Sequence, residues 1–337
     1  MRVYLKFFEC PIFINIYFFS RIMYNLNPLF IERIKKLSED DKDFNNFILS
    51  IEKKSLTSIR CNTIKISPEE LRKKLEKKGW KISQPYSLYP EIMIIESNLA
   101  PGELGNSIEN RNGEFYIQDL SSMMPCIILS PSEKDVILDL CASPGSKTTY
   151  LSMMMKNKGT IIANDYDLER IYVLNSNLYR CSCTNTIVTR NDAIQLCKNL
   201  LKIDAKFDKI LLDVPCSGEG IIKNDKEKIE KWNIQEINKL SNIQKKIIAS
   251  AIPLLKNNGS LVYSTCTYAP EENEEVIDFA LKNFPIEIEK INIPLFSREG
   301  ITTWYGKKYD ERVRLCKRIY PQDNKSDGFF IAKLKRM

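Results

Sequence analysis

Residues 261–274 are Leu261-Val262-Tyr263-Ser264-Thr265-Cys266-Thr267-Tyr268-Ala269-Pro270-Glu271-Glu272-Asn273-Glu274, an apolar strand that runs into a cysteine and then into a proline and an acidic helix start. Residues 210–218, Ile210-Leu211-Leu212-Asp213-Val214-Pro215-Cys216-Ser217-Gly218, follow the same plan of apolar strand, acid and cysteine. In a parallel sheet both cysteines would lie at the carboxyl ends of strands, where open α/β sheets bind their ligands. The two stretches therefore predict a ligand-binding sheet edge with two thiols and a carboxylate.

The rest of the C-terminal two thirds alternates between strand and helix patterns. The strands are expected at Val136–Leu140, Thr160–Asn164, Thr186–Thr189, Lys209–Asp213, Gly259–Thr265 and Phe329–Leu334. The helices are expected at Lys147–Lys156, Leu168–Arg180, Ile234–Leu255 and Glu271–Asn283. This alternation predicts an α/β fold with a doubly wound, mostly parallel, Rossmann-like sheet.

The N-terminal part has a different pattern. Residues Leu26–Ile51 have helical periodicity, and a small α/β module follows, with a strand at Ser58–Ile64 and a helix that begins at Pro68 after Ser67. Further strand-like segments lie near residues 80–82 and 92–96, and the Gly/Asn-rich stretch 101–113 is typical of a linker. The module is basic, and its charges fit either an RNA-facing surface or a solvated helix face.

The composition is that of a folded protein. Among 337 residues, 50 Lys and Arg against 43 Asp and Glu give a net charge of +7, which permits a polyanionic partner without requiring one. The chain has no histidine, and its ten cysteines include no Cys-x-x-Cys pair. We therefore expect no metal site and no His-dependent catalysis. The scattered cysteines favour a reducing, intracellular compartment, the cytoplasm or the nucleus.

The first 23 residues carry Arg2 and Lys6 ahead of an apolar run, Cys10–Phe19, that Pro11 and Asn15 interrupt. The run is too short to span a bilayer, so we expect no membrane partner. An organelle-targeting segment, an extra helix and a disordered lead all remain open. We expect the chain to be a monomer.

A cofactor site is predicted by Leu138-Asp139-Leu140-Cys141-Ala142-Ser143-Pro144-Gly145-Ser146-Lys147-Thr148-Thr149, a strand, a tight turn and a helix start. The turn has neither the Walker spacing nor the three glycines of the dinucleotide fingerprint. Asp165 ends the second strand, where doubly wound folds bind ribose hydroxyls, while Asp192 is placed for an adenine edge and Asp213 for the reacting end. Acids at successive strand ends fit S-adenosylmethionine. Helix capping is the alternative for Asp165 and Asp192.

Several motifs in order resemble the RNA cytosine-C5 methyltransferases of the NOL1/NOP2/Sun (RsmB/Nop2) family. They are Ser58-Ile59-Arg60-Cys61-Asn62-Thr63, Phe115-Tyr116-Ile117-Gln118-Asp119-Leu120-Ser121-Ser122, the cofactor turn, Asp213-Val214-Pro215-Cys216-Ser217-Gly218, Thr265-Cys266-Thr267 with the acidic stretch after it, and Arg318-Ile319-Tyr320-Pro321 before Gly328-Phe329. The chain departs from the family pattern at Ser143, Ser146, Val214 and Gln322.

The resemblance implies a class I methyltransferase domain over residues 111–337, preceded by a helical segment with a small RRM-like RNA-binding module over 25–110 and by an apolar lead over 1–24. It implies that RNA, either tRNA or rRNA, is the substrate. It assigns Cys266 as the nucleophile and Cys216 as its helper. The S-adenosylmethionine site implied by the resemblance consists of Cys141, Ala142, Ser143, Pro144, Gly145, Ser146, Lys147, Asp165, Arg170, Asp192 and Asp213.

Carbon 5 of cytosine is too weak a nucleophile to accept a methyl group directly. The hypothesis is that the Cys266 thiolate attacks carbon 6 and that Asp213 hydrogen-bonds the N3/N4 edge. Cys216 would help, through water, to remove the carbon-5 proton and to release the enzyme. Lys147 would orient Asp213 or a neighbouring loop. Two alternatives stay open: Cys216 as nucleophile, as in DNA cytosine methylases, and a non-catalytic RNA-binding or assembly factor.

Two further stretches have two interpretations each. The acids in Glu271-Glu272-Asn273-Glu274 are either a catalytic acid pair or, as we expect, a helix N-terminus that complements the helix dipole. A basic stretch near the C-terminus contains Arg312, Arg314, Lys317 and Arg318, with Tyr320 after them. This stretch either binds the RNA backbone or is exposed to solvent.

Overall fold

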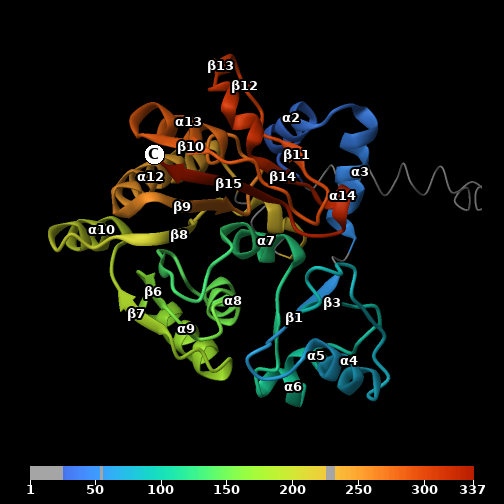
Figure 1. Cartoon of the computed structure of the whole chain (residues 1–337). Helices are drawn as coiled ribbons and strands as arrows, with labels where there is room; N and C mark the ends of the chain where they lie inside the picture. The colour runs from blue at the N-terminus through green and yellow to red at the C-terminus, as the bar shows by residue number, and fades with distance from the viewer. Residues whose placement is uncertain (1–25, 54–55, 225–231) are drawn as a thin grey trace, which may run out of the picture.

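The structure is a computed structural model that describes residues 26–53, 56–224 and 232–337. Within these residues the largest sheet has the strand order β11-β14-β15-β9-β8-β5-β6-β7, with β10 paired to β15. Figure 1 shows this sheet crossing the molecule, with the small N-terminal module below it. The apolar lead over residues 1–24 lies outside the described residues. No helix in the described part of the chain is long and apolar enough to cross a membrane.

The strands that bear the predicted site form the parallel part of the sheet. They are β5 (Val136–Asp139), β6 (Thr160–Asp165), β7 (Thr186–Arg190), β8 (Phe207–Asp213) and β9 (Leu255–Thr265). The chain leaves β5 toward β6 and β7 on one side and later returns to β8 and β9 on the other. The strand order therefore reverses between β5 and β8, and the doubly wound sheet is confirmed.

The other edge of the sheet is antiparallel. Here β15 (Phe329–Arg336) pairs with β9, and β14 (Lys317–Ile319) pairs with β15. The short strands β10 (Ile286–Ile288) and β11 (Arg298–Glu299) complete this edge. The sequence patterns predicted only β15 among these four strands, because the others are two or three residues long.

Helices cover both faces of the sheet. One face packs against α7 (Leu120–Leu129), α8 (Ser146–Met154) and α9 (Leu168–Arg180). The other packs against α10 (Ala193–Lys202), α12 (Ile234–Ala251) and α13 (Glu274–Asn283).

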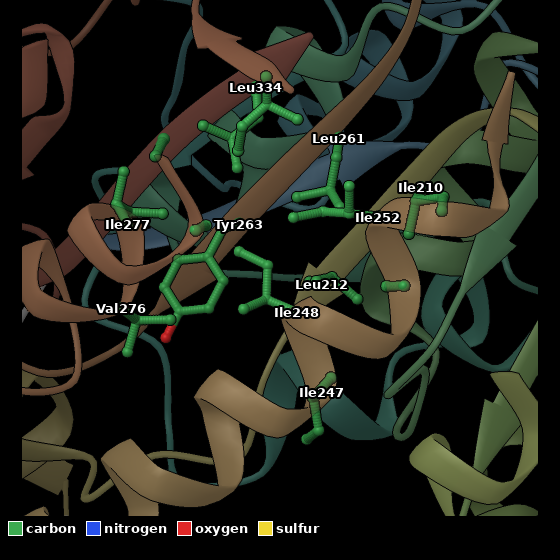
Figure 2. Close-up of a cluster of buried hydrophobic side chains, with 14 of the residues drawn as sticks. Ile210, Leu212, Ile247, Ile248, Ile252, Leu261, Tyr263, Val276, Ile277 and Leu334 are labelled. Atoms are coloured by element: carbon green, nitrogen blue, oxygen red, sulfur yellow. The ribbon is translucent and has the colours of Figure 1, made fainter. Parts of the chain in front are cut away.

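The side chains of the central strands alternate between these two layers. Leu211 and Val262 face the layer of α7 and α8, whereas Leu212 and Tyr263 face α12 and α13. Figure 2 shows Leu212 and Tyr263 gathered in one cluster with Ile248 of α12 and Val276 of α13. Because both faces are buried, β8 and β9 are nearly continuous apolar runs, and their polar ends emerge at one edge of the sheet.

The small module is a second sheet, antiparallel, in the order β2-β3-β1-β4. Its strands are β1 (Thr57–Cys61), β2 (Ile82–Ser83), β3 (Ile92–Ile95) and β4 (Phe115–Ile117), and α4 (Pro68–Glu76) packs on it. The predicted helix start is present, since Ser67 and Glu70 form a capping box. The predicted linker instead forms two short helices, α5 (Glu103–Asn106) and α6 (Ile108–Arg111).

The N-terminal helical segment lies on a different part of the molecule. It forms α2 (Pro28–Leu37) and α3 (Asp41–Glu52), and Figure 1 shows these blue helices beside the red C-terminal elements. Arg298 pairs with Asp43 of α3 and with Asp323 of α14 (Pro321–Asn324). The helical segment and the small module, expected together over residues 25–110, thus contact different parts of the chain. The small sheet also extends beyond residue 110, because its strand β4 is Phe115–Ile117.

The remaining described elements are short and lie around the C-terminal strands. They are the hairpin β12 (Thr303–Trp304) and β13 (Lys307–Lys308) and the 3-10 segments η2 (Glu219–Asn224), η3 (Ile252–Leu254) and η4 (Glu311–Leu315).

Candidate active site

The two cysteines that follow β8 and β9 face each other. Their Sγ atoms lie 3.3 Å apart, within hydrogen-bonding distance for sulfur. The register explains this approach, because Asp213 at the end of β8 lies opposite Ser264 in β9. The amide of Gly220 then donates to the carbonyl of Cys266 at 2.8 Å, which draws the β8 loop back over the end of β9. The sulfurs therefore share one site although the two cysteines are 50 positions apart in the sequence.

The two thiols are not equivalent. The hydrogen bond with Cys266 and burial together raise the pKa of Cys216 well above its ordinary value. The thiol form of Cys216 is therefore favoured, while the 3.3 Å separation allows either sulfur to be the hydrogen-bond donor. Cys266 also lines a cavity of about 400 Å³, together with Tyr116, Asp213 and Phe329. Of the two cysteines, only Cys266 is among the residues that line this cavity.

Asp213 is held in this cavity from two sides. Lys147 Nζ lies 2.6 Å from its Oδ2 atom, and the Ser264 hydroxyl donates to its Oδ1 atom at 2.8 Å. Burial disfavours the charge on Lys147, but Asp213 outweighs it, so the pKa of Lys147 is raised. Lys147 also donates to the Ser122 hydroxyl. The carboxylate therefore has a fixed orientation beside Cys266.

The predicted cofactor turn is fastened to the next strand and helix. The amide of Ser143 donates to Asp165 at 3.1 Å, and the Arg170 guanidinium donates to the Ser143 carbonyl at 2.7 Å. Gly145 has a φ of 100°, and a side chain there would meet Leu174 at 3.0 Å. Glycine fits this position because it has no Cβ. The turn thus presents its backbone and the start of α8 to the sheet edge.

A second cavity of about 220 Å³ lies beside this turn. Cys141, Asp165, Arg170 and Asp192 line it, along with Ile247 of α12. Its acids are placed for hydroxyl and amine donors, and its apolar wall suits a flat ring. Asp192 also caps α10 by accepting from the Gln195 amide, so the capping role left open for it is present as well.

Asp139 lies at the base of the turn and was not predicted as a site residue. Its Oδ2 atom accepts from Thr148, while its Oδ1 atom is buried without a hydrogen-bond partner among the described residues. Burial raises the pKa of Asp139 to about 7. Asp139 is thus buried beneath the cofactor turn and is not among the residues that line either cavity.

The residues predicted for the cofactor divide between the two cavities. Cys141, Asp165, Arg170 and Asp192 line the smaller one, and Pro144, Ser146, Lys147 and Asp213 line the larger one. Ala142, Ser143, Gly145 and Cys216 are not among the lining residues of either. Ala142, Ser143 and Gly145 form the turn itself. Cys216 contacts the sulfur of Cys266, which lines the larger cavity.

The small module reaches the site through Arg60. This buried guanidinium donates to the Ser146 carbonyl at 2.7 Å and to the Thr149 hydroxyl at 2.8 Å, both in α8. It also lies over the Tyr150 ring, 4.5 Å from its centroid. Arg60 is one of the basic residues of this module, but burial removes it from any RNA-facing surface. It instead joins the module to the cofactor turn.

In the acidic stretch after Cys266, Glu274 lies in the first turn of α13, as expected, whereas Glu271 and Glu272 precede the helix, and all three acids have partners elsewhere. Glu271 pairs with Arg33 of α2, Glu272 accepts from Ser217 beside Cys216, and Glu274 pairs with Arg318 of β14. All three acids are buried. Each acid connects the end of β9 to a different segment.

The basic stretch with Tyr320 was interpreted either as a contact for the RNA backbone or as a solvated segment, and the structure separates its residues. Arg318 and Tyr320 are buried, and Arg318 donates to Glu274 and to the Tyr268 carbonyl. Arg312 and Arg314 are exposed and pair with neighbouring acids. Arg318 therefore has a structural role, and the interpretation of an RNA grip does not apply to it.

Sequence reasoning assigned no role to several residues that line the larger cavity. Gln118 and Ser122 come from the motif at residues 115–122, and Phe329 begins β15. The available signal was that both motifs carry the family resemblance. Their position could not be derived, since Gln118 follows the short strand β4, Ser122 lies in the first turn of α7, and Phe329 begins an antiparallel strand.

The fold and the site together define a class of protein. The strand order reverses between β5 and β8, an antiparallel strand β15 lies beyond β9, and acids end the strands that border the cavities. This combination is that of a Rossmann-like methyltransferase.

Known proteins identify the family. The family profile described as 16S rRNA methyltransferase RsmB/F matches residues 126–335. A tRNA (cytosine(49)-C(5))-methyltransferase from Pyrococcus abyssi is 37% identical over 92% of this chain and 96% of its own length. Ribosomal RNA small subunit methyltransferase F from Vibrio atlanticus is 35% identical over 91% of this chain, which spans only 63% of that protein. The chain belongs to the RsmB/F family, as its motifs indicated.

A solved structure gives the same result. NSun6 from Pyrococcus horikoshii, solved with SFG, superposes with a TM-score of 0.76 at 25% identity and covers 91% of this chain and 97% of its own. SFG is an analogue of S-adenosylmethionine. The protein is an S-adenosylmethionine-dependent methyltransferase, and the cofactor predicted from the strand-end acids is confirmed.

Proposed function

We propose that this protein methylates carbon 5 of cytosine in structured RNA, through a transient covalent bond between Cys266 and carbon 6 of the base. The observation that carries the proposal is the 3.3 Å approach of the Cys216 and Cys266 sulfurs at the wall of a cavity that also holds Asp213. One thiol forms the bond and the second assists its cleavage. Relatives named as tRNA and rRNA cytosine-C5 methyltransferases support the same chemistry.

Cys266 adds to the base. Its thiolate forms a bond to carbon 6, and the electron pair of the 5,6 double bond moves toward N3 and makes carbon 5 nucleophilic. The buried Lys147 ammonium lies close enough to interact with the Cys266 thiolate, which favours the charged sulfur.

Asp213 binds the Watson–Crick edge of the base. Lys147 and Ser264 occupy the carboxylate from two sides and fix its direction, so that it can accept from the N4 amine without reorganising. An acceptor at this position favours cytosine, since uracil presents a carbonyl there. Tyr116 and Phe329 offer aromatic surface for the flipped base in the same cavity.

Cys216 acts at release. After methylation the carbon-5 proton leaves to water, the double bond reforms, and the bond between carbon 6 and Cys266 breaks. The Cys216 thiol stays protonated because its pKa is raised, so it donates a hydrogen bond to the departing sulfur. The methyl group itself is supplied by S-adenosylmethionine, for which Asp165, Arg170 and Asp192 form the binding cleft.

Transfer RNA is the substrate that we favour within structured RNA. The tRNA-modifying relative matches over 96% of its own length, whereas the chain spans 63% of the rRNA-modifying relative. A loop or junction lowers the cost of unstacking the target base, which is a few kcal/mol, and both classes of RNA offer such sites.

The test is a methylation assay with the purified protein, labelled S-adenosylmethionine and separate unmodified tRNA and rRNA pools. Digestion to nucleosides and mass spectrometry should find 5-methylcytidine, chiefly from tRNA. Label in N4-methylcytidine or in 5-methyluridine would contradict the assignment of the reacting atom. Bisulfite sequencing of the methylated pool then names the cytosine.

A further inference from the structure

The loop that carries Cys216 is held by a buried carboxylate that the reaction itself does not use. Glu272 lies in the segment after Cys266 and is fully buried. Its Oε2 atom accepts from the amide of Ser217 at 3.0 Å, and its Oε1 atom accepts from the Ser217 hydroxyl at 2.5 Å. Ser217 directly follows Cys216. Two hydrogen bonds therefore fix the peptide on the carboxyl side of the second thiol.

The peptide on the other side of Cys216 is fixed by the same group of side chains. Gln244 of α12 donates to the Pro215 carbonyl at 2.8 Å and to Glu272 Oε2, also at 2.8 Å. Pro215 directly precedes Cys216. Glu272 and Gln244 thus bracket the thiol through the backbone groups on both sides of it, without touching the sulfur.

The group formed by Glu272, Gln244 and Ser217, called the bracket below, also contacts the residue next to Cys266. The Ser217 and Thr267 hydroxyls lie 2.8 Å apart, and Thr267 directly follows Cys266. Thr267 in turn donates to Glu219 Oε2 at 3.0 Å. These polar contacts therefore connect the residue after Cys216 with the residue after Cys266.

We infer that Glu272 is a positioning residue for the release step: it holds Cys216 against Cys266, so that the covalent bond to the base can be broken once the methyl group has been transferred. The inference rests on the proposed function. Addition of Cys266 to the base does not need Cys216, so loss of Glu272 should affect release far more than addition.

The charge on Glu272 acts in the same direction. Among the causes that raise the pKa of Cys216, after the Cys266 hydrogen bond and burial, are the negative charges of Cys266 and Glu272. Burial raises the pKa of Glu272 itself to about 7, so its charge is present above that pH, where it favours the thiol form of Cys216. Geometry and charge therefore both favour Cys216 as the thiol that assists release.

The experiment compares Glu272→Gln with the wild-type enzyme in two measurements on the same RNA. Single-turnover formation of the covalent protein–RNA species is followed on denaturing gels, and steady-state methylation is followed with labelled cofactor. The amide preserves size but removes the charge and turns an NH2 group toward the donors. We expect adduct formation within about 3-fold of wild type, turnover lower by about 10-fold to 100-fold, and adduct accumulation.

Three further variants sharpen the comparison. Glu275→Gln, three positions along, removes an acid that pairs with Lys245 and Lys307 and should leave both rates unchanged. Ser217→Ala removes one donor of the bracket and should give a smaller defect of the same kind. In the double variant Glu272→Gln/Cys216→Ala, turnover should fall no further than in Cys216→Ala alone, because both changes disable one step.

Two results would overturn the inference. Adduct formation and turnover that fall together would mean that Glu272 supports the whole site, and rates equal to wild type would mean that the bracket is dispensable. If Glu272→Gln does not fold, Ser217→Ala decides by the same criteria. A wild-type enzyme that neither methylates RNA nor forms an adduct refutes the proposed function instead, whereas a normal wild type with an unaffected Glu272→Gln refutes only the positioning role.

Discussion

Lys147 and Asp213 form a 2.6 Å ion pair in which only 8% of the lysine side chain is exposed. The lysine comes from the first turn of α8 and the aspartate from the end of β8, so the pair spans the point where the strand order reverses. It therefore couples the cofactor turn to the cavity that holds Cys266.

This pair predicts the effect of Lys147→Met, which keeps the length of the side chain but removes its charge. Asp213 would lose one of its two anchors and the positive charge beside it, so the single-turnover rate of methyl transfer should fall by about 100-fold to 1000-fold. Lys158→Met, which removes an exposed lysine paired with Glu133, is the matched control and should react normally. A Lys147→Met enzyme with an unchanged rate would show that the ion pair does not support the reaction.

Arg318 and Glu274 predict a loss of stability rather than of RNA binding. Their side chains are 3% and 0% exposed, so Arg318→Met leaves a buried carboxylate unpaired and should lower the free energy of unfolding by about 3–5 kcal/mol. The control Arg314→Met breaks an exposed pair and should cost about 0–1 kcal/mol. Denaturant unfolding measures both. The RNA affinity of the folded Arg318→Met protein should equal that of wild type. A selective loss of RNA affinity would instead support the interpretation that Arg318 contacts the RNA backbone.

Asp139 predicts a specific dependence of stability on pH. Its pKa is about 7 in the folded protein, against an ordinary value of 3.8 for an exposed aspartate, so the folded state binds more protons than the unfolded chain between these pH values. Its contribution to stability is present at low pH and is lost as the pH rises through 7, by at most about 1.4 kcal/mol per unit.

The variant Asp139→Asn should therefore gain stability relative to wild type when the pH rises from 5 to 8. Unfolding in denaturant at both pH values, without cofactor, measures this difference. Asp204→Asn, at a side chain that is 89% exposed, should show no such change. Parallel pH profiles for Asp139→Asn and wild type would mean that Asp139 does not carry the buried proton.

The central sheet and the two thiols could be predicted from the sequence for one physical reason. A strand buried on both faces is a continuous apolar run, and the first polar residues after it mark the sheet edge. Residues 210–218 and 261–274 have this form, and the structure brings Cys216 and Cys266 together. The cofactor turn was predictable because a strand, a glycine turn and a helix start follow one another without a gap.

Other elements were not predicted, for different reasons. Helix α7 is apolar on nearly all sides and contains Pro125, so neither the helical pattern nor the breaker rule predicts it. Helix α10 was not predicted either, although Asp192 caps it. The acids after Cys266 resemble a helix start in sequence, whereas their partners Arg33, Ser217 and Arg318 lie far away along the chain. Only tertiary structure reveals such partners.

Trapping of the covalent protein–RNA species tests the central claim most directly. Cys216→Ala and Cys266→Ala enzymes are each incubated with RNA and S-adenosylmethionine, denatured and resolved on a gel. We expect a slow-migrating adduct to accumulate with Cys216→Ala and to be absent with Cys266→Ala. The opposite pattern, with an adduct from Cys266→Ala and none from Cys216→Ala, would contradict the account and identify Cys216 as the nucleophile.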